Sequence, residues 1–188
     1  MDTLLSVMVG IGLAAACGFR VFVPLLVLSL AAQSGEMTLA HGFAWIGSKP
    51  ALLAFAVATV IEITGYYIPW VDHLLDTVAT PTAVVAGILV TASSLGHTSP
   101  FLQWSLALLA GGGTAAVFQG LTAAARGVST LTTGGLGNPV VSTVEAGGAA
   151  LLSVLAITVP VLTVLALVLL LYFGVKKLLF RRPAARAA

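Results

Sequence analysis

The chain has 188 residues and a formal net charge of +2, and 59% of its residues are hydrophobic whereas only 7% are charged. A soluble domain carries charges on roughly a quarter of its residues, so this composition excludes a surface that faces water on all sides. The mean hydropathy of +1.11 predicts an integral membrane protein, and the length allows one helical bundle without a separate soluble domain.

The first apolar run extends from Leu4 to Ala32 and is interrupted only by Arg20 and Pro24. It is longer than the roughly 20 residues that a membrane helix needs. After a polar loop, the second run extends over residues 51–68 and contains Glu62. An aromatic belt of the kind found at membrane interfaces closes this run with Tyr66, Tyr67 and Trp70.

A short amphipathic helix is predicted at residues 71–78. Its apolar residues recur with helical spacing, and Asp72 and Asp76 fall on the opposite face. This pattern is typical of a helix that lies in the membrane interface. Pro81 then begins a short third run that reaches about residue 95, and a fourth run extends over residues 101–125.

The stretch 126–139, RGVSTLTTGGLGNP, is rich in hydroxyl groups and glycine and has no helical apolar pattern. It fits an ordinary loop, a re-entrant segment or the unwound part of a broken helix. The fifth run, residues 140–159, contains Glu145, and Pro160 begins the sixth run, which ends near Leu179. The sequence therefore predicts an all-α membrane bundle with about six transmembrane helices.

The basic residues of the chain are concentrated at its end. Five of the eight lie there, namely Lys176, Lys177, Arg181, Arg182 and Arg186. The positive-inside rule predicts a cytoplasmic tail, and six spans predict that both termini are cytoplasmic in a bacterial inner membrane. We expect the tail to contact anionic lipid and not nucleic acid. The single cysteine, Cys17, excludes an internal disulfide, and no spacing of residues predicts a metal or a cofactor.

The two halves of the chain share an order of features: a helix of small residues with an arginine, a proline, a helix with a glutamate and a helix begun by proline. The matched pairs are Arg20 with Arg126, Pro24 with Pro139, and Glu62 with Glu145. Chance matches are common in sequences rich in alanine and glycine, but the shared order favours a real repeat. Three spans per half make the repeat inverted, as in many transporters. The prediction is one membrane domain over residues 1–188, with halves 1–96 and 97–179 and a basic tail at 180–188.

Charged residues within the apolar runs are the first candidates for a site, because a charge in the bilayer costs a few kcal/mol or more. They are Arg20, Glu62, Arg126 and Glu145. The functional interpretation is a polar site in which carboxylates bind a cation or proton and arginines hold an anionic group. The structural alternative, weighted equally, is arginine–glutamate pairs that only hold helices together.

The hydroxyl-rich and glycine-rich stretch is the second candidate. Glycines allow close approach of backbone to a ligand, and a helix that begins at Pro139 directs free N–H groups toward an anion. The alternative is a flexible loop between helices. The candidate residues are Thr132, Thr133, Gly135, Asn138 and Pro139.

Three segments carry a resemblance to a known family: GLAAACGFRVFVPL at 12–25, residues 62–76 with PWVD and LLD, and TTGGLGNPVVSTVE at 132–145. They resemble the domain of unknown function 4126 family, a group of small bacterial membrane proteins. The resemblance covers most of the chain, and Gly-Asn-Pro is its most specific part. It implies that the arginine, Gly-Asn-Pro, glutamate and aspartate positions are family features, and it implies no activity.

The sequence favours a small transporter, channel or lipid-flipping protein with a central polar site for a small ion or an amphipathic substrate. A non-transporting membrane organiser or complex subunit is the alternative. A third hypothesis, an intramembrane lipid-modifying enzyme, is disfavoured because no nucleophile–base pair is recognisable. A homodimer is compatible with the small size of the chain.

Overall fold

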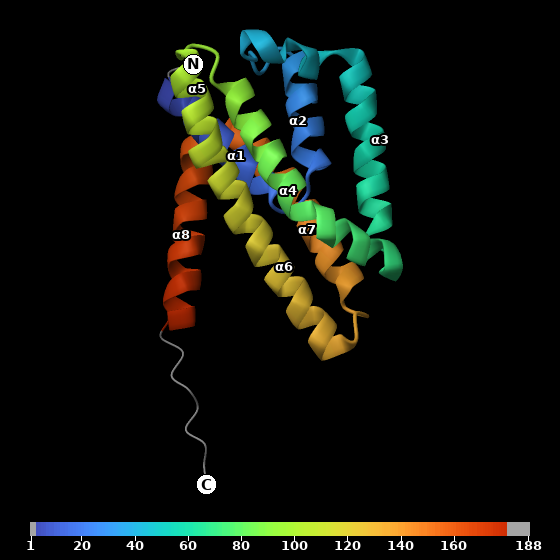
Figure 1. Ribbon diagram of the computed structural model, residues 1–188. Coiled ribbons are helices and arrows are strands. Elements are labelled where there is room, and N and C mark those ends of the chain that lie inside the picture. Colours follow the sequence, from blue (N-terminus) through green and yellow to red (C-terminus); the bar gives the residue numbers. More distant parts are fainter. Residues whose placement is uncertain (1–2, 180–188) are drawn as a thin grey trace.

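Figure 1 shows the computed structural model of the protein, which describes residues 3–179. The first half forms α1 (Thr3–Cys17), α2 (Phe22–Gln33), the 3₁₀ helix η1 (His41–Gly47), α3 (Lys49–Gly65) and α4 (Pro69–Ser94). The second half forms α5 (Pro100–Leu106), the π-helical segment η2 (Ala107–Gly112), α6 (Gly113–Thr133), α7 (Asn138–Thr158) and α8 (Pro160–Leu179). Residues 3–179 contain no strand, which confirms the all-α prediction. The tail predicted at 180–188 lies outside the described residues.

Prolines and hydroxyl caps mark where the helices begin. Ser48 accepts a hydrogen bond from the backbone N–H of Ala51 (3.3 Å), and Ser99 accepts one from Leu102 (3.4 Å). Proline fits the first turn of a helix because a backbone N–H at that position has no partner within the helix, so no hydrogen bond is lost when proline lacks the N–H. Accordingly, α3, α4, α5, α7 and α8 all carry a proline at their first or second position.

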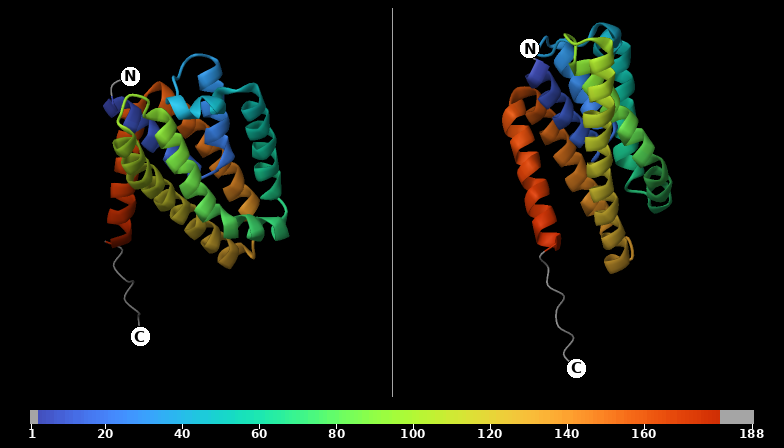
Figure 2. Two further views of the ribbon diagram at one scale, coloured as in Figure 1. Left: turned by 45° about the horizontal axis from the view of Figure 1, so that its top comes forward. Right: turned by 60° about the vertical axis from the view of Figure 1, so that its left-hand side comes forward.

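The first apolar run folds as a hairpin of two short helices. The turn at residues 18–21 separates α1 from α2. The start of α1 and the end of α2 lie at the same end of the bundle (Figures 1 and 2). Ser6 near the start of α1 and Glu36 just after α2 line one small pocket there, together with Gly96. The run therefore enters the bundle and returns. The break precedes Pro24, which lies in the first turn of α2.

Gly18 allows this turn to pack closely against α6. A Cβ atom at Gly18 would lie 2.8 Å from the backbone nitrogen of Gln119 and 2.9 Å from the carbonyl oxygen of Ala115, so a larger residue cannot fit without moving backbone. The hydroxyl group of Thr122 donates to the Gly18 carbonyl oxygen (3.2 Å). Neighbouring helices thus satisfy the backbone that the break leaves open, as membrane depth requires.

α4 is one helix of 26 residues, and the separate interfacial helix predicted at 71–78 is therefore wrong. Pro81 lies inside α4 and does not begin it, and the helix bends along its course (Figures 1 and 2), as proline commonly causes. Asp72 is 3% exposed whereas Leu74 is 70% exposed. The helical spacing predicted for residues 71–78 is confirmed. The face that carries Asp72 points into the bundle, because lipid and not water surrounds the protein.

α6 is longer than the fourth apolar run predicted. The helix continues through residues 126–133, and the irregular stretch expected at 126–139 shrinks to a turn at 134–137. Gly134 and Gly135 have φ angles of 63° and 89°, a conformation that side chains disfavour and glycine adopts readily. The glycines of this stretch therefore serve a tight turn between α6 and α7.

Length and composition qualify three described helical segments to cross a membrane: Leu74–Ser94, Pro100–Thr133 and Asn138–Thr158. η1 and α3, which meet at an angle of 62°, add a fourth if they are counted as one span. α1, α2 and the apolar part of α8 are shorter. The structure thus supports three or four spans, and the six spans and the inverted repeat are not confirmed.

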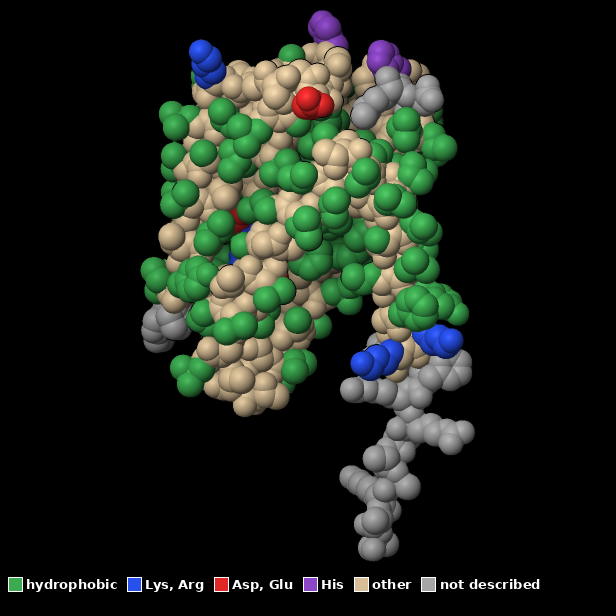
Figure 3. Space-filling view, turned by 180° about the vertical axis from the view of Figure 1, so that it is seen from behind, with side chains coloured by type: hydrophobic (Ala, Val, Ile, Leu, Met, Phe, Trp, Pro, Cys, Tyr) green, Lys and Arg blue, Asp and Glu red, His purple; other side chains and the backbone are tan. Residues whose placement is uncertain are grey.

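The chain enters and leaves the bundle at opposite ends (Figure 1). α8 ends with Lys176 and Lys177 in its last turn, far from the start of α1. Charged and histidine side chains gather at the two ends in the space-filling view, whereas the sides between them are largely apolar (Figure 3). The expectation of two termini on one side does not fit this arrangement, because the first run returns to the end from which it starts.

α1 lies at the centre of the bundle, where α4, α6, α7 and α8 contact it. Its last four residues, Ala14 to Cys17, have no exposed surface. Small side chains let neighbouring helices approach closely, which is the usual packing of helices in membranes. This packing places the Gly18–Val21 turn in the interior of the protein.

Candidate functional site

Charged side chains meet at the interior turn and form one buried cluster, which we call the charge network. Ion pairs join its members. Within residues 3–179 these members are Arg20, Asp72, Asp76, Arg126 and Glu145. They come from the α1–α2 turn, α4, α6 and α7. Their side chains are at most 6% exposed except that of Asp76, which is 39% exposed and forms the edge of the cluster.

Arg126 is the centre of the charge network. Its Nε donates to Glu145 Oε1 (3.1 Å) and its Nη2 donates to Glu145 Oε2, so the two side chains form a forked pair. Its Nη1 donates to Asp72 Oδ1 (2.7 Å) and lies 3.5 Å from Asp76 Oδ1. Forked arginine–carboxylate pairs combine charge attraction with a fixed geometry, so Arg126 locks α4, α6 and α7 together.

Arg20 reaches the same glutamate from the α1–α2 turn. Its Nη2 lies 3.2 Å from Glu145 Oε2 and donates to the hydroxyl (2.5 Å) and the carbonyl oxygen (3.1 Å) of Ser142. Arg20 is only 1% exposed, yet its Nε and Nη1 have no hydrogen-bond partner within the described residues. Buried donors without hydrogen-bond partners are rare in folded proteins.

Tyr66 lies between the two arginines. The guanidinium carbons of Arg20 and Arg126 are each 3.9 Å from the centre of its ring. An aromatic face attracts a cation, most strongly where water is excluded. Tyr66 thus allows two like charges to approach each other in the interior of the bundle.

Glu62, on α3, binds the first residues of α2 instead of an arginine. Its Oε1 accepts the backbone N–H of Val21 (2.8 Å) and its Oε2 accepts that of Phe22 (3.1 Å). The N-terminus of a helix offers free N–H groups and a partial positive charge, which suits a carboxylate. Glu62 is 7% exposed and forms no ion pair with any residue in the range 3–179.

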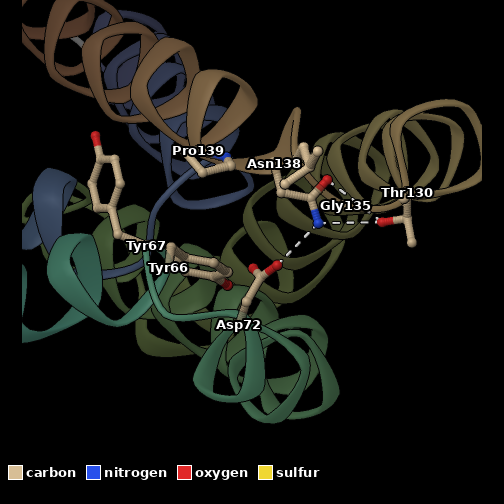
Figure 4. A pocket seen from close by; sticks show the side chains of 9 residues that line it. Tyr66, Tyr67, Asp72, Thr130, Gly135, Asn138 and Pro139 are labelled. Atoms are coloured by element: carbon tan, nitrogen blue, oxygen red, sulfur yellow. Dashed lines mark hydrogen bonds between the residues drawn. The ribbon is translucent and has the colours of Figure 1, made fainter.

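Asn138 connects the charge network to a pocket of about 200 Å³ between the α3–α4 and α6–α7 connections. Its Nδ2 donates to Asp72 Oδ2 (3.1 Å) and to the hydroxyl of Thr130 (3.2 Å), as Figure 4 shows. Gly135 and Pro139 also line this pocket. The pocket lies beside the buried aspartate and connects it with one end of the bundle.

The structure brings most of the predicted site residues together. Those in or beside the charge network are Arg20, Glu62, Arg126, Asn138 and Glu145, and those lining the pocket at Asn138 include Gly135 and Pro139. Thr132 and Thr133 are not among them. Their hydroxyl groups donate to the carbonyl oxygens of Val128 (2.8 Å) and Ser129 (2.7 Å), so both stabilise the last turns of α6.

Three residues of the site were assigned elsewhere from the sequence, and a fourth was missed. Asp72 and Asp76 were placed in an interfacial helix, Tyr66 in an aromatic belt, and Ser142 was not singled out. A signal for Asp72 was present, because the polar face of an amphipathic helix belongs inside a bundle that lipid surrounds. The sequence contains no corresponding signal for the position of Tyr66 between two arginines.

The site has more carboxylates than cations. All acidic residues within 3–179 except Glu36 gather here. Asp72, Asp76 and Glu145 pair with the guanidinium groups of Arg20 and Arg126, and Glu62 lies beside them at the start of α2. A low-dielectric interior tolerates a net charge poorly, and the surplus favours protonation or a bound cation. No group of three or more histidine, cysteine, aspartate or glutamate side chains suited to a metal ion occurs in the described part of the chain.

The fold and this site define a helical membrane protein with a buried ionic cluster at a helix break. The family model described as "Domain of unknown function (DUF4126)" matches residues 7–179, and the chain belongs to this family. The resemblance expected from the sequence is thereby confirmed. Comparisons with curated proteins and with solved structures give no match.

Proposed function

We propose that this protein is a small transporter, channel or lipid-flipping protein of a bacterial inner membrane. The charge network and Glu62 form its binding site. The observation that carries the proposal is the cluster of four carboxylates and two arginines at the α1–α2 turn, of which all but Asp76 are buried and in which Nε and Nη1 of Arg20 have no hydrogen-bond partner among the described residues. Ionisable groups at membrane depth are costly and typically mark the path of an ion or substrate.

The broken first run supports this function. Transporters commonly place substrate and ion sites where helices break, because half-helix termini then point at the ligand. Here the N–H groups at the start of α2 face Glu62, and Arg20 stands in the turn itself. Arg20 and Arg126, which the predicted halves 1–96 and 97–179 place in equivalent positions, contact the same tyrosine. The contact of both arginines with one tyrosine supports an inverted repeat, which we include in the proposal.

The α3–α4 and α6–α7 connections, which line the pocket at Asn138, lie toward the end of the bundle where α8 ends (Figure 1). Lys176 and Lys177 in the last turn of α8 support a cytoplasmic location of this end by the positive-inside rule. The charge network is then reached from the cytoplasm, and the α1–α2 hairpin enters from the outer side. The basic end of α8 is suited to contact with anionic lipid.

A second function, that of a membrane organiser or complex subunit, has one observation in its favour. Arg126 has a carboxylate partner for each of its three nitrogens, as a group that only joins helices would have. In that case the charge network stabilises the bundle, and no ligand alters its stability. The two functions are separated by whether loss of a carboxylate abolishes flux in a protein that is still folded.

Reconstitution into liposomes tests the proposal. We expect flux of ions or of a fluorescent lipid above that of empty liposomes, and an approximately tenfold lower rate for Glu62→Gln, because a site residue loses its charge. Glu36→Gln, which alters an exposed glutamate outside the site, is the matched control and should retain the rate. Unaltered flux in both Glu62→Gln and Glu145→Gln variants of an active protein would contradict the role assigned to these carboxylates.

A further inference from the structure

An apolar pocket of about 300 Å³ lies beside Glu62 on the side of the bundle, between α2, α3 and α4. We call it the Glu62 pocket. Its walls are aliphatic and aromatic apart from the carboxylate and the hydroxyl groups of Tyr66 and Thr82, and they include Phe22, Ala58, Ile61, Leu75 and Val78. The pocket therefore joins a buried negative group to a surface that suits hydrocarbon.

The charge of Glu62 has no counter-charge in direct contact. Backbone N–H groups of Val21 and Phe22 satisfy its hydrogen-bonding needs, and the start of α2 offers only a partial positive charge instead of a full one. Within the described range, both arginines of the charge network are engaged by Glu145 and the aspartates instead. Since the site as a whole has two carboxylates in excess, a cation is the ligand whose charge complements it.

The walls decide what kind of cation fits. A hard metal ion needs about six oxygen ligands, and here it would find a carboxylate and the hydroxyl groups of Thr82 and Tyr66 only. An organic cation with an apolar body needs no such shell, because aliphatic walls contact its body while the carboxylate faces its charge. The pocket chemistry thus favours a lipophilic cation over a metal ion.

The pocket is reached from the lipid side of the bundle. Ile61 is 62% exposed and Val78 is 53% exposed, and both residues form part of its rim. Apolar side chains exposed in the middle of an apolar helix face the hydrocarbon of the membrane. A ligand that partitions into the bilayer can therefore reach Glu62 without crossing water.

We propose that the Glu62 pocket binds an amphipathic organic cation, with its positive group at the Glu62 carboxylate and its apolar body against Ile61, Leu75 and Val78. The inference rests on the proposed function, since it names the substrate class of the same site. Its physical basis is the combination of an unpaired buried carboxylate with an apolar wall that opens to lipid.

Equilibrium binding of radiolabelled tetraphenylphosphonium to the full chain in phosphatidylcholine nanodiscs tests the proposal, with binding to empty nanodiscs subtracted. We expect saturable binding that Glu62→Gln weakens by about tenfold or more, because a desolvated charge pair is lost. Glu36→Gln should bind as the unmodified protein does. Tetramethylammonium, which has the charge but little apolar body, should compete poorly. Affinity that is unchanged in Glu62→Gln overturns the proposal.

A second variant locates the site independently of the carboxylate. Ala58→Leu fills the pocket with apolar volume and keeps Glu62, so it should weaken binding by about tenfold or more. Ala54→Leu, on an exposed part of the same helix outside the pocket, is its matched control. If Ala58→Leu leaves the affinity unchanged, the cation does not bind in this pocket. If Ala58→Leu weakens binding but Glu62→Gln binds as the unmodified protein does, the cation binds in the pocket without the Glu62 carboxylate, and the proposed role of Glu62 is wrong.

Binding and transport distinguish this inference from the proposed function. If liposomes show ion or lipid flux that depends on Glu62 but the protein does not bind tetraphenylphosphonium, the substrate class is wrong and the transporter stands. If the cation binds through Glu62 but no flux of the cation, of ions or of lipid is found, the site stands and the transport function is wrong.

Discussion

Glu62 and Glu145 are the buried glutamates of the described chain, and each lines an apolar pocket on the side of the bundle. Glu145 forms ion pairs with Arg20 and Arg126. Glu62 accepts two backbone N–H groups, and no ion pair of it occurs in residues 3–179. Two residues of one type, one in each half of the chain, therefore have opposite electrostatic surroundings.

The difference separates a structural carboxylate from an available one. Glu145 cannot leave its partners without exposing two guanidinium groups to a low-dielectric interior, which is costly. Glu62 forms no ion pair within residues 3–179, while two backbone N–H groups satisfy its hydrogen bonds. The position of a charge within a membrane is thus not enough to assign it a role, because the nearest counter-charge decides whether a ligand can compete for it.

The largest loss of stability is expected for Glu145→Gln. The variant leaves Arg20 and Arg126 without their shared partner, and breaking a buried pair in this way costs about 3–5 kcal/mol in the free energy of unfolding. Equilibrium unfolding in mixed micelles measures the change. Glu36→Gln is the control, and a change for Glu145→Gln no greater than that of the control would remove the structural half of the comparison.

A smaller loss is expected for Arg126→Lys. Lysine keeps the positive charge but lacks the planar fork that holds both oxygens of Glu145 and reaches Asp72. The loss of hydrogen bonds between charged groups should lower the free energy of unfolding by about 2–3 kcal/mol. The same unfolding measurement applies. A lysine variant as stable as the unmodified protein would show that only charge matters at this position.

Tyr66→Leu should have a moderate effect. It removes the ring that separates the two guanidinium groups, and two cation–π contacts together should contribute about 1–2 kcal/mol. Tyr66→Phe keeps the ring and serves as the matched control, so it should retain most of the stability. Equal losses in both variants would assign the effect to the hydroxyl group and not to the aromatic face.

Glu62→Gln should have the smallest effect on stability, about 1 kcal/mol or less, because glutamine loses one accepted hydrogen bond and also removes an uncompensated charge. The same variant should have a large effect on ligand binding. Comparing unfolding of Glu62→Gln with that of Glu145→Gln sharpens the contrast between the two glutamates. A loss for Glu62→Gln as large as that for Glu145→Gln would make both glutamates structural.

Much of the site could be predicted from the cost of charges in a membrane. That principle singles out Arg20, Glu62, Arg126 and Glu145, and the structure gathers all four around one turn. It could not place Asp72, because helical spacing gives the two faces of a helix but not which of them faces the interior. It also could not place Tyr66, whose contacts depend on how α3 packs in the bundle.

The path of the first apolar run could not be predicted from its composition. Residues 4–32 are apolar enough for a span, and hydropathy carries no information on whether a chain crosses or returns. The close contact of Gly18 with the backbone of α6 decides the outcome, and it joins residues about a hundred positions apart. The end of α6 was missed for a similar reason, since the hydroxyl groups of Thr132 and Thr133 bond within the helix instead of breaking it.

We propose that the Glu62 carboxylate is available to a ligand of the transport site, whereas Glu145 stabilises that site by pairing with its arginines. The most direct test is the rate of ion and lipid flux in liposomes that contain equal amounts of folded protein, for the unmodified chain and for Glu62→Gln. We expect that Glu62→Gln remains folded, with a thermal midpoint close to that of the unmodified chain, and loses most of the flux. A folded Glu62→Gln variant with the flux of the unmodified protein would contradict it.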